Sequence, residues 1–174
     1  MFLPCEPTCS VYVGTFIFVT KFEDMQIGEE IKQGKFEDNQ QKALINLIFT
    51  HNWLKERLST FLKDFDITVQ QFNVLRILNG QYPNGITTGE IRNRMLDKMS
   101  DASRLVDRLE RCGHVAKEKN VDDRRLVTCV ITEQGRDILN QIRSKETELY
   151  GPIRTRLSSE EAEVLSNLLD KVRD

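Results

Sequence analysis

Apolar residues recur at three- and four-residue steps over most of this chain, which is the periodicity of amphipathic helices. The longest such stripe covers residues 39–65 and is too long to be buried within one small domain. Shorter stripes follow at residues 69–79, 100–112, 132–149 and 158–172. Residues 114–131 instead combine alternation in steps of two with many β-branched side chains. The pattern therefore predicts a mainly α fold with one small β-hairpin.

Capping residues indicate where several of these helices begin and end. Four helix starts carry a side chain that can cap the first turn. Three have the spacing of a capping box, namely Thr68 with Gln71, Thr87 with Glu90, and Ser158 with Glu161, and the fourth is capped by Thr132. Asn79-Gly80 and Gly113 are helix stops. Gly151-Pro152 is expected to separate the last two helices.

The helix expected at residues 100–112 has two different faces. Ala102, Leu105, Val106 and Leu109 form an apolar stripe that must face a core. The residues opposite or flanking this stripe are mostly arginines, serines and acids: Ser100, Asp101, Ser103, Arg104, Asp107, Arg108 and Arg111. Arginine can bond a guanine edge or phosphates with two donors, and serine fits close to a base, so this face suits a DNA major groove. An ordinary solvated helix face is the alternative.

The polar tip of the hairpin, residues 120–125, contains both acids and arginines. It is either a solubilising turn or a DNA contact, because an arginine braced by a nearby carboxylate suits a narrow minor groove. A short helix at 88–95, the helix at 100–112 and the hairpin occur in the order of a winged helix-turn-helix.

These segments resemble the MarR family of bacterial transcriptional regulators. The resemblance rests on ITVQQFNVLRIL, TTGEI, SDASRLVDRLER, GHV, DDRRLV and ITEQG, in this order, and covers roughly residues 39–174. It implies an obligate homodimer, a winged helix-turn-helix that binds a palindromic operator in double-stranded DNA, and often a small-molecule or oxidant signal that releases the DNA.

Carried over position by position, the resemblance assigns roles to individual residues. It places Ser100, Ser103 and Arg104 on the groove-reading helix and makes Arg125 the minor-groove arginine of the wing, braced by Asp123. Arg124 lies beside them within reach of phosphate. Asp101 departs from the small neutral residue usual in the family and brings a carboxylate near the DNA. Asp107, three residues from Arg104 and four from Arg111, is expected to hold those two side chains in place.

The resemblance also divides the chain. Residues 1–38 form a poorly defined leader, 39–66 an N-terminal dimerisation helix, 67–131 the DNA-binding domain, and 132–174 the C-terminal dimerisation helices. Terminal helices that pack on a symmetric copy would place two recognition helices about one DNA turn, roughly 34 Å, apart. The alternative is that these helices cover the core of a single monomer.

Charge is distributed in agreement with DNA binding. The formal net charge of the chain is −2, whereas residues 91–125 contain ten Lys or Arg against seven Asp or Glu. The basic residues are therefore concentrated where DNA contact is expected.

Catalytic and metal-binding motifs do not occur in the sequence, so we expect no enzyme, cofactor or metal. The two histidines, His51 and His114, are far apart and have no metal-binding partner at close spacing. Both are expected to be structural. His51 lies on the inward side of the first long helix, where it is the candidate ligand-binding residue of an effector pocket or a pH-sensitive interface.

The four cysteines, at positions 5, 9, 112 and 129, lack the spacing of a zinc site or a secreted disulfide framework. Reduced cytoplasmic thiols are expected, with Cys112 and Cys129 as small packing residues. Some members of the family sense oxidants through a cysteine in the first long helix, and this chain has none between residues 39 and 65.

The first 24 residues are the least informative part. Val11 to Val19 is apolar but too short to span a bilayer, and it lacks the features of a signal peptide, so no membrane partner is expected. Either translation begins at Met25, or the leader forms a strand or arm on the dimer.

The resulting hypothesis is a cytoplasmic, homodimeric DNA-binding repressor, with a small-molecule effector bound between the dimerisation helices and the winged domain. Two alternatives remain. One is a winged-helix protein-interaction module that binds no DNA, and the other is a cysteine-based oxidant-sensing regulator.

Overall fold

Helices form most of the chain, as the periodicity predicts. The computed structural model describes residues 26–119 and 127–173 of the 174. The elements in chain order are α1 (Ile27–Glu30), α2 (Asn39–Leu62), the short 3₁₀ helix η1 (Lys63–Phe65), α3 (Val69–Asn79), β1 (Ile86–Thr87), α4 (Thr88–Arg94), α5 (Ala102–Arg111), β2 (Val115–Lys119), β3 (Val127–Ile131), α6 (Glu133–Ser144), α7 (Glu146–Arg156) and α8 (Ser159–Arg173). The chain divides between Leu47 and Ile48 into two compact units.

The first unit contains α1, which the sequence did not predict, and the first turns of α2. α2 begins at Asn39, where the Asp38 carboxylate accepts a hydrogen bond from the Gln41 backbone N–H at 2.7 Å. This bond satisfies one of the donors that a helix start leaves unpaired. Leu44 and Leu47, two members of the predicted stripe, are exposed in this unit.

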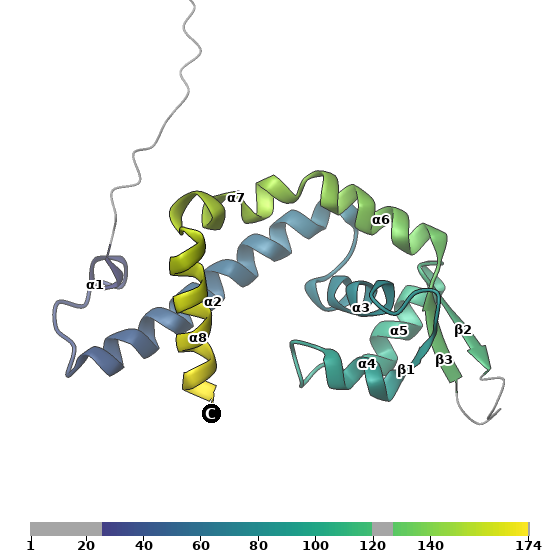
Figure 1. The fold of residues 1–174 in the computed structure, drawn as a ribbon, viewed down its shortest axis with the longest axis horizontal. Coiled ribbons are helices and arrows are strands. Elements are labelled where there is room, and N and C mark those ends of the chain that lie inside the picture. Colours follow the sequence, from purple (N-terminus) through teal and green to yellow (C-terminus); the bar gives the residue numbers. More distant parts are fainter. Residues whose placement is uncertain (1–25, 120–126, 174) are drawn as a thin grey trace, which may run out of the picture. The chain divides into compact units, whose positions relative to one another are not determined.

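The second unit contains a three-stranded antiparallel sheet in the order β1-β3-β2, with α3, α4 and α5 beside it (Figure 1). The expected hairpin is present as β2 and β3, in a register that pairs Val115 with Ile131 and Lys117 with Cys129. β1 adds a third strand through Ile86 and Thr87, which pair with Cys129 and Thr128. The mainly helical fold with a small β wing is therefore confirmed.

One hydrophobic core joins these helices to the sheet. Its fully buried side chains come from α2 through α5 and from β3: Leu62, Val74, Leu75, Leu78, Ile91, Met95, Val106, Leu109, Cys129 and Ile131. The predicted stripes of α3 and α5 supply four of these ten side chains, Leu75, Leu78, Val106 and Leu109. Burial of this apolar surface fixes which face of α5 remains available outside.

The predicted caps are confirmed at every site named. Thr68 with Gln71 and Thr87 with Glu90 form complete capping boxes at the starts of α3 and α4. Thr132 accepts a hydrogen bond from the Gly135 N–H at the start of α6. Before α8, Ser158 and Glu161 exchange two bonds of 2.9 and 3.1 Å.

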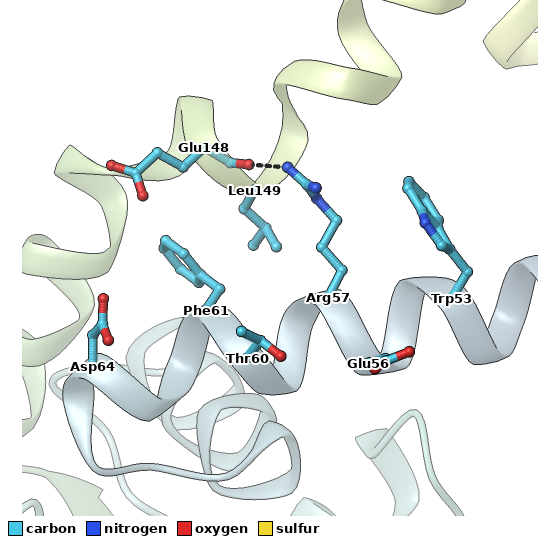
Figure 2. Close-up of a pocket in the computed structure, with 8 residues that line it drawn as sticks. All are labelled: Trp53, Glu56, Arg57, Thr60, Phe61, Asp64, Glu148 and Leu149. Atoms are coloured by element: carbon cyan, nitrogen blue, oxygen red, sulfur yellow. Dashed lines mark hydrogen bonds between the residues drawn. The ribbon is translucent and has the colours of Figure 1, made fainter. Parts of the chain in front are cut away.

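The helix boundary expected at Gly151-Pro152 is wrong, because α7 runs through both residues and the break lies at Lys145 instead. Proline has no N–H, so Pro152 leaves the Glu148 carbonyl, four residues earlier, without its usual helical donor. The Arg57 guanidinium of α2 donates to that carbonyl oxygen at 2.6 Å (Figure 2). A contact 91 residues away in sequence thus replaces the missing bond.

Within residues 26–119 and 127–173, none of the helices combines the length and the apolar character needed to cross a membrane.

Candidate nucleic-acid interface

α5 is held with one face inward and its termini fixed. Ala102, Val106 and Leu109 are buried, and Leu105 packs partly against the same core. At its C-terminus Gly113 has φ of 77°, and the N–H groups of Gly113 and His114 bond the carbonyls of Glu110 and Leu109, each at 2.9 Å. This is a Schellman ending, which favours glycine at the left-handed position. The chain can then turn directly into β2.

The start of α5 differs from the expected one. The helix begins at Ala102, and Asp101 is its N-cap, with the carboxylate accepting from the Arg104 N–H at 3.1 Å. Ser100, expected on the helix, precedes it, and the Ser100 hydroxyl donates to Asp97 Oδ2 at 2.9 Å. This bond is the main cause of the lowered pKa of Asp97. The helix starts later than expected because the Asp101 side chain accepts from a first-turn N–H. This makes Asp101 the N-cap and Ala102 the first helical residue.

The outward face of α5 carries the predicted basic residues. Ser103, Arg104, Arg108 and Arg111 are all exposed. The Arg104 side chain is 82% exposed, and its Nε lies 3.3 Å from Asp101 Oδ2. Asp101 therefore has two roles here: it caps α5, and it orients the guanidinium of Arg104. A carboxylate that braces an arginine in this way limits the directions in which the arginine donates.

Lys117 of β2 bridges the sheet to α5. Its Nζ lies 2.6 Å from Asp107 Oδ1 and 2.7 Å from Glu110 Oε2. The hydrogen bonds to Asp107 and Glu110 raise the pKa of Lys117, and the same bond from Lys117 is the largest cause of the lowered pKa of Asp107. The Lys117 side chain is 27% exposed and its partners Asp107 and Glu110 are 55% and 41% exposed, so these are surface ion pairs that share one lysine. α5 and β2 are thereby tied together.

The role expected for Asp107 is corrected by this bridge. Its carboxylate bonds Lys117, Arg104 pairs with Asp101, and Arg111 donates only to the Asp107 main-chain oxygen at 3.3 Å. The sequence did not lead us to predict the pairing of Lys117 with Glu110 and Asp107. Two features are consistent with it: strand alternation places Lys117 on the same face as buried Val115, and the acids at 107 and 110 share one side of a helix.

The predicted wing residues Asp123, Arg124 and Arg125 lie outside the described residues, as does the rest of the polar tip from 120 to 126. Their roles stay predictions. The described strands β2 and β3 lead to and from this tip.

The two histidines differ in environment. His114 is buried, and burial lowers its pKa, so its imidazole is neutral near pH 7 and adds no positive charge to the interface. Its Nδ1 has no hydrogen-bond partner in the structure. His51 is exposed and borders a cavity between α2 and α3.

The two described cysteines also differ. Cys129 is buried, as expected of a packing residue, and burial raises the pKa of its thiol. Cys112 is exposed, which corrects its assignment as a packing residue. Among the described residues, His, Cys, Asp and Glu side chains form no group of three or more that could hold a metal ion. Cys5 and Cys9 fall outside that part of the chain.

The outward face of α5 offers the guanidinium groups of three arginines, of which Arg104 is oriented by Asp101, and the hydroxyl of Ser103. Such groups can bond phosphates and base edges.

Comparison with known proteins finds similarity to one family over the same segments. The sequence model of the MarR family matches residues 65–126. The Multiple antibiotic resistance protein MarR of Salmonella typhimurium is 29% identical over 136 residues, covering 77% of this chain and 93% of that protein. An uncharacterized HTH-type transcriptional regulator of Bacillus cereus is 29% identical over 141 residues, covering 78% of this chain and 90% of the relative.

Solved structures of MarR and MepR are similar to this chain in fold. A mutant MarR from E. coli complexed with operator DNA aligns with a TM-score of 0.65 and 29% identity, covering 79% of this chain and 99% of that chain. A MepR-DNA complex from S. aureus aligns with a TM-score of 0.65 at 24% identity, covering 75% and 94% of the two chains, and this likeness concerns the fold.

Proposed function

This chain belongs to the MarR family of transcriptional regulators, and we propose that it acts as a cytoplasmic homodimeric repressor that binds a palindromic operator and responds to a small ligand. The observation that carries the proposal is the outward face of α5. Arg104, Arg108 and Arg111 are exposed there, while Ala102, Val106 and Leu109 on the opposite face are buried in the core. A rigid helix with several free arginine donors on one side is suited to enter a major groove.

The terminal helices support the homodimer. α8 leaves four large apolar side chains exposed, in one stripe at helical spacing: Val164, Leu165, Leu168 and Val172. Exposed apolar stripes of this kind mark protein interfaces more often than monomer surfaces. A symmetric partner would cover the stripe and present two copies of α5 to one face of the DNA. Palindromic half-sites follow from that symmetry.

The proposal is tested with DNA from upstream of the protein's own gene. We expect specific binding whose affinity falls with salt at a log-log slope of about −0.9 per phosphate contact. Sedimentation should give a dimer, footprinting should show two half-sites, and a reporter should be repressed. Undetectable binding to this DNA and to selected random duplexes would contradict the proposal and favour a winged-helix protein-interaction module.

An effector site is supported by a cavity of about 510 Å³ between α2, α3 and the loop that precedes α5. Its apolar lining includes Leu54, Leu58 and Met95, and Lys55 and Lys98 lie at its border with Asp97. The Asp97 carboxylate is already bonded to Ser100 and to the Met99 N–H. Two lysines against one carboxylate leave the lining of this cavity with a net positive charge, which favours an organic anion with an apolar body.

This cavity connects directly to the DNA-reading helix. The loop residue Leu96 donates its N–H to Asn73 Oδ1 of α3 at 2.9 Å, and the same loop ends at the cap of α5. A ligand that displaces this loop would shift the start of α5. We propose this shift as the route by which an effector releases DNA.

We expect 4-methylbenzoate to weaken operator binding by the parent protein and to bind Lys55→Gln about 5- to 10-fold less tightly, the loss of one charge-assisted bond. Calorimetry and operator titration with the same samples measure both effects. His51→Leu tests the candidate histidine of this cavity. Unchanged DNA affinity, effector response and pH response in that variant would remove His51 from the site, and equal ligand affinity in Lys55→Gln would remove the anion assignment.

A further inference from the structure

A second cavity lies on another face of α2, between the end of that helix, η1 and α7. Its volume is about 540 Å³, within the range of roughly 300 to 1,000 Å³ typical of small-molecule sites. Figure 2 shows that Trp53, Arg57 and Phe61 rise from α2 toward Leu149 and Glu148 of α7. This cavity shares no lining residue with the one bordered by Lys55, so a ligand could occupy it whether or not the other cavity binds an effector.

One end of the cavity presents an unused hydrogen-bond donor. Arg57 Nη2 donates to the Glu148 carbonyl, which fixes the guanidinium between α2 and α7. The Arg57 Nε is buried and has no hydrogen-bond partner. The Trp53 ring lies beside it, with its centroid 5.9 Å from the guanidinium carbon. A buried charged donor without an acceptor is costly, so a ligand oxygen placed here would gain a charge-assisted bond.

The other end of the cavity is acidic. Figure 2 shows the Asp64 and Glu148 carboxylates on the Phe61 side, with the Glu148 carboxylate turned away from Arg57. Glu56 also lines the cavity, so three carboxylates oppose a simple anion and attract a cation, and the Phe61 ring adds an aromatic surface near Asp64. The two ends therefore select opposite charges on one ligand.

We propose that this cavity binds a small aromatic zwitterion. The ligand carboxylate accepts from Arg57 Nε, the ring lies against Leu149 and Phe61, and the ligand ammonium faces Asp64 (Figure 2). Because Arg57 also holds the Glu148 carbonyl, a bound ligand joins α2 to α7 more firmly. The ligand class is an aromatic ring with a carboxylate at one end and a primary amine at the other.

Three probes of nearly the same shape test the proposal by calorimetry on the full-length protein: 4-(aminomethyl)benzoate, 4-methylbenzoate and 4-methylbenzylamine. We expect the zwitterion to bind about 10-fold or more tightly to this site than either singly charged probe, since each loses one charge-assisted interaction. Arg57→Gln should weaken zwitterion binding by about 10-fold or more. Arg143→Gln, at an exposed position on α6 outside both cavities, should leave zwitterion binding unchanged.

Arg57→Gln also removes the bond to α7, so a second variant separates binding from folding. Asp64 is exposed and Asp64→Asn keeps its shape, so this variant should melt like the parent and lose the preference for the zwitterion over 4-methylbenzoate. Equal zwitterion binding by the parent, Arg57→Gln and Asp64→Asn would overturn the proposal. It would also be overturned if the parent bound none of the probes, as expected if a second copy of the chain covers the cavity.

Discussion

Replacing Gly135 by alanine is expected to destabilise the protein by about 3 kcal/mol, the upper part of the range for added atoms in a packed region. A Cβ at this position would lie 2.3 Å from the His114 carbonyl oxygen and 2.8 Å from Ile131 Cγ1. The first of these neighbours is backbone and cannot rotate away. His114 is also tied down, because its carbonyl accepts from the Thr132 N–H at 3.1 Å. The start of α6 would have to move away from the turn that joins α5 to β2.

Denaturant unfolding of Gly135→Ala and Gly89→Ala measures this effect with a matched control. Gly89 lies in the first turn of α4, and the nearest atom to a Cβ there is Thr87 Oγ1 at 3.8 Å. Its replacement adds no clash and gains helix propensity of at most about 1 kcal/mol. The midpoint should therefore fall for Gly135→Ala and stay equal or rise for Gly89→Ala. Equal midpoints for the parent and Gly135→Ala would contradict the steric explanation.

The local features of the fold could be predicted from sequence because their causes lie within four residues. A capping box such as Thr87 with Glu90 needs only the first turn of its own helix. The left-handed Gly113 is equally local, and so is the apolar stripe of α5. These signals sufficed to place α5 to within two residues.

The remaining features depend on contacts between distant segments. α7 continues through Pro152, where Arg57 supplies a donor to the Glu148 carbonyl, and no periodicity in residues 146–156 contains that information. β1 has only two residues and forms because β3 offers an edge. Lys117 was similarly overlooked, since a lysine in a short strand is ordinarily solvated, and its partners on α5 become apparent only once the strand is docked.

In the candidate site, the sequence identified the basic face of α5 but not what each acid does there. Asp101 was expected to bring a carboxylate near the DNA, and in the structure that carboxylate caps the helix and orients Arg104. Asp107 looked like a brace for arginines and is instead bonded to Lys117. Both acids are thus engaged in positioning the helix. Each has a partner that offsets its repulsion of phosphate.

Arg104→Ala is expected to weaken operator binding by about 1 to 3 kcal/mol and to relax base preference within the half-site. The reason is its position: Arg104 lies in the first turn of α5, is largely exposed, and has its guanidinium oriented by Asp101. A fixed guanidinium can donate twice to one base edge, which a neutral methyl group cannot replace. Operator titration at fixed salt, followed by selection from a randomised half-site, measures both quantities.

Three further variants distinguish base reading from simple loss of charge. Arg104→Lys keeps the charge but not the paired donors, so it should recover salt-dependent affinity without recovering base preference. Arg143, exposed on α6, is the control, and Arg143→Ala should leave base preference unchanged.

By the sequence-based prediction for the wing, Arg125→Ala should weaken binding mainly to A·T-rich flanks. If Arg104→Ala and Arg125→Ala both bound every sequence like the parent, the residue roles would be wrong although the family would stand. Lysine at 104 that restored full base preference would instead assign Arg104 to phosphate, because a point charge suffices there and a base edge requires the two donors of the guanidinium.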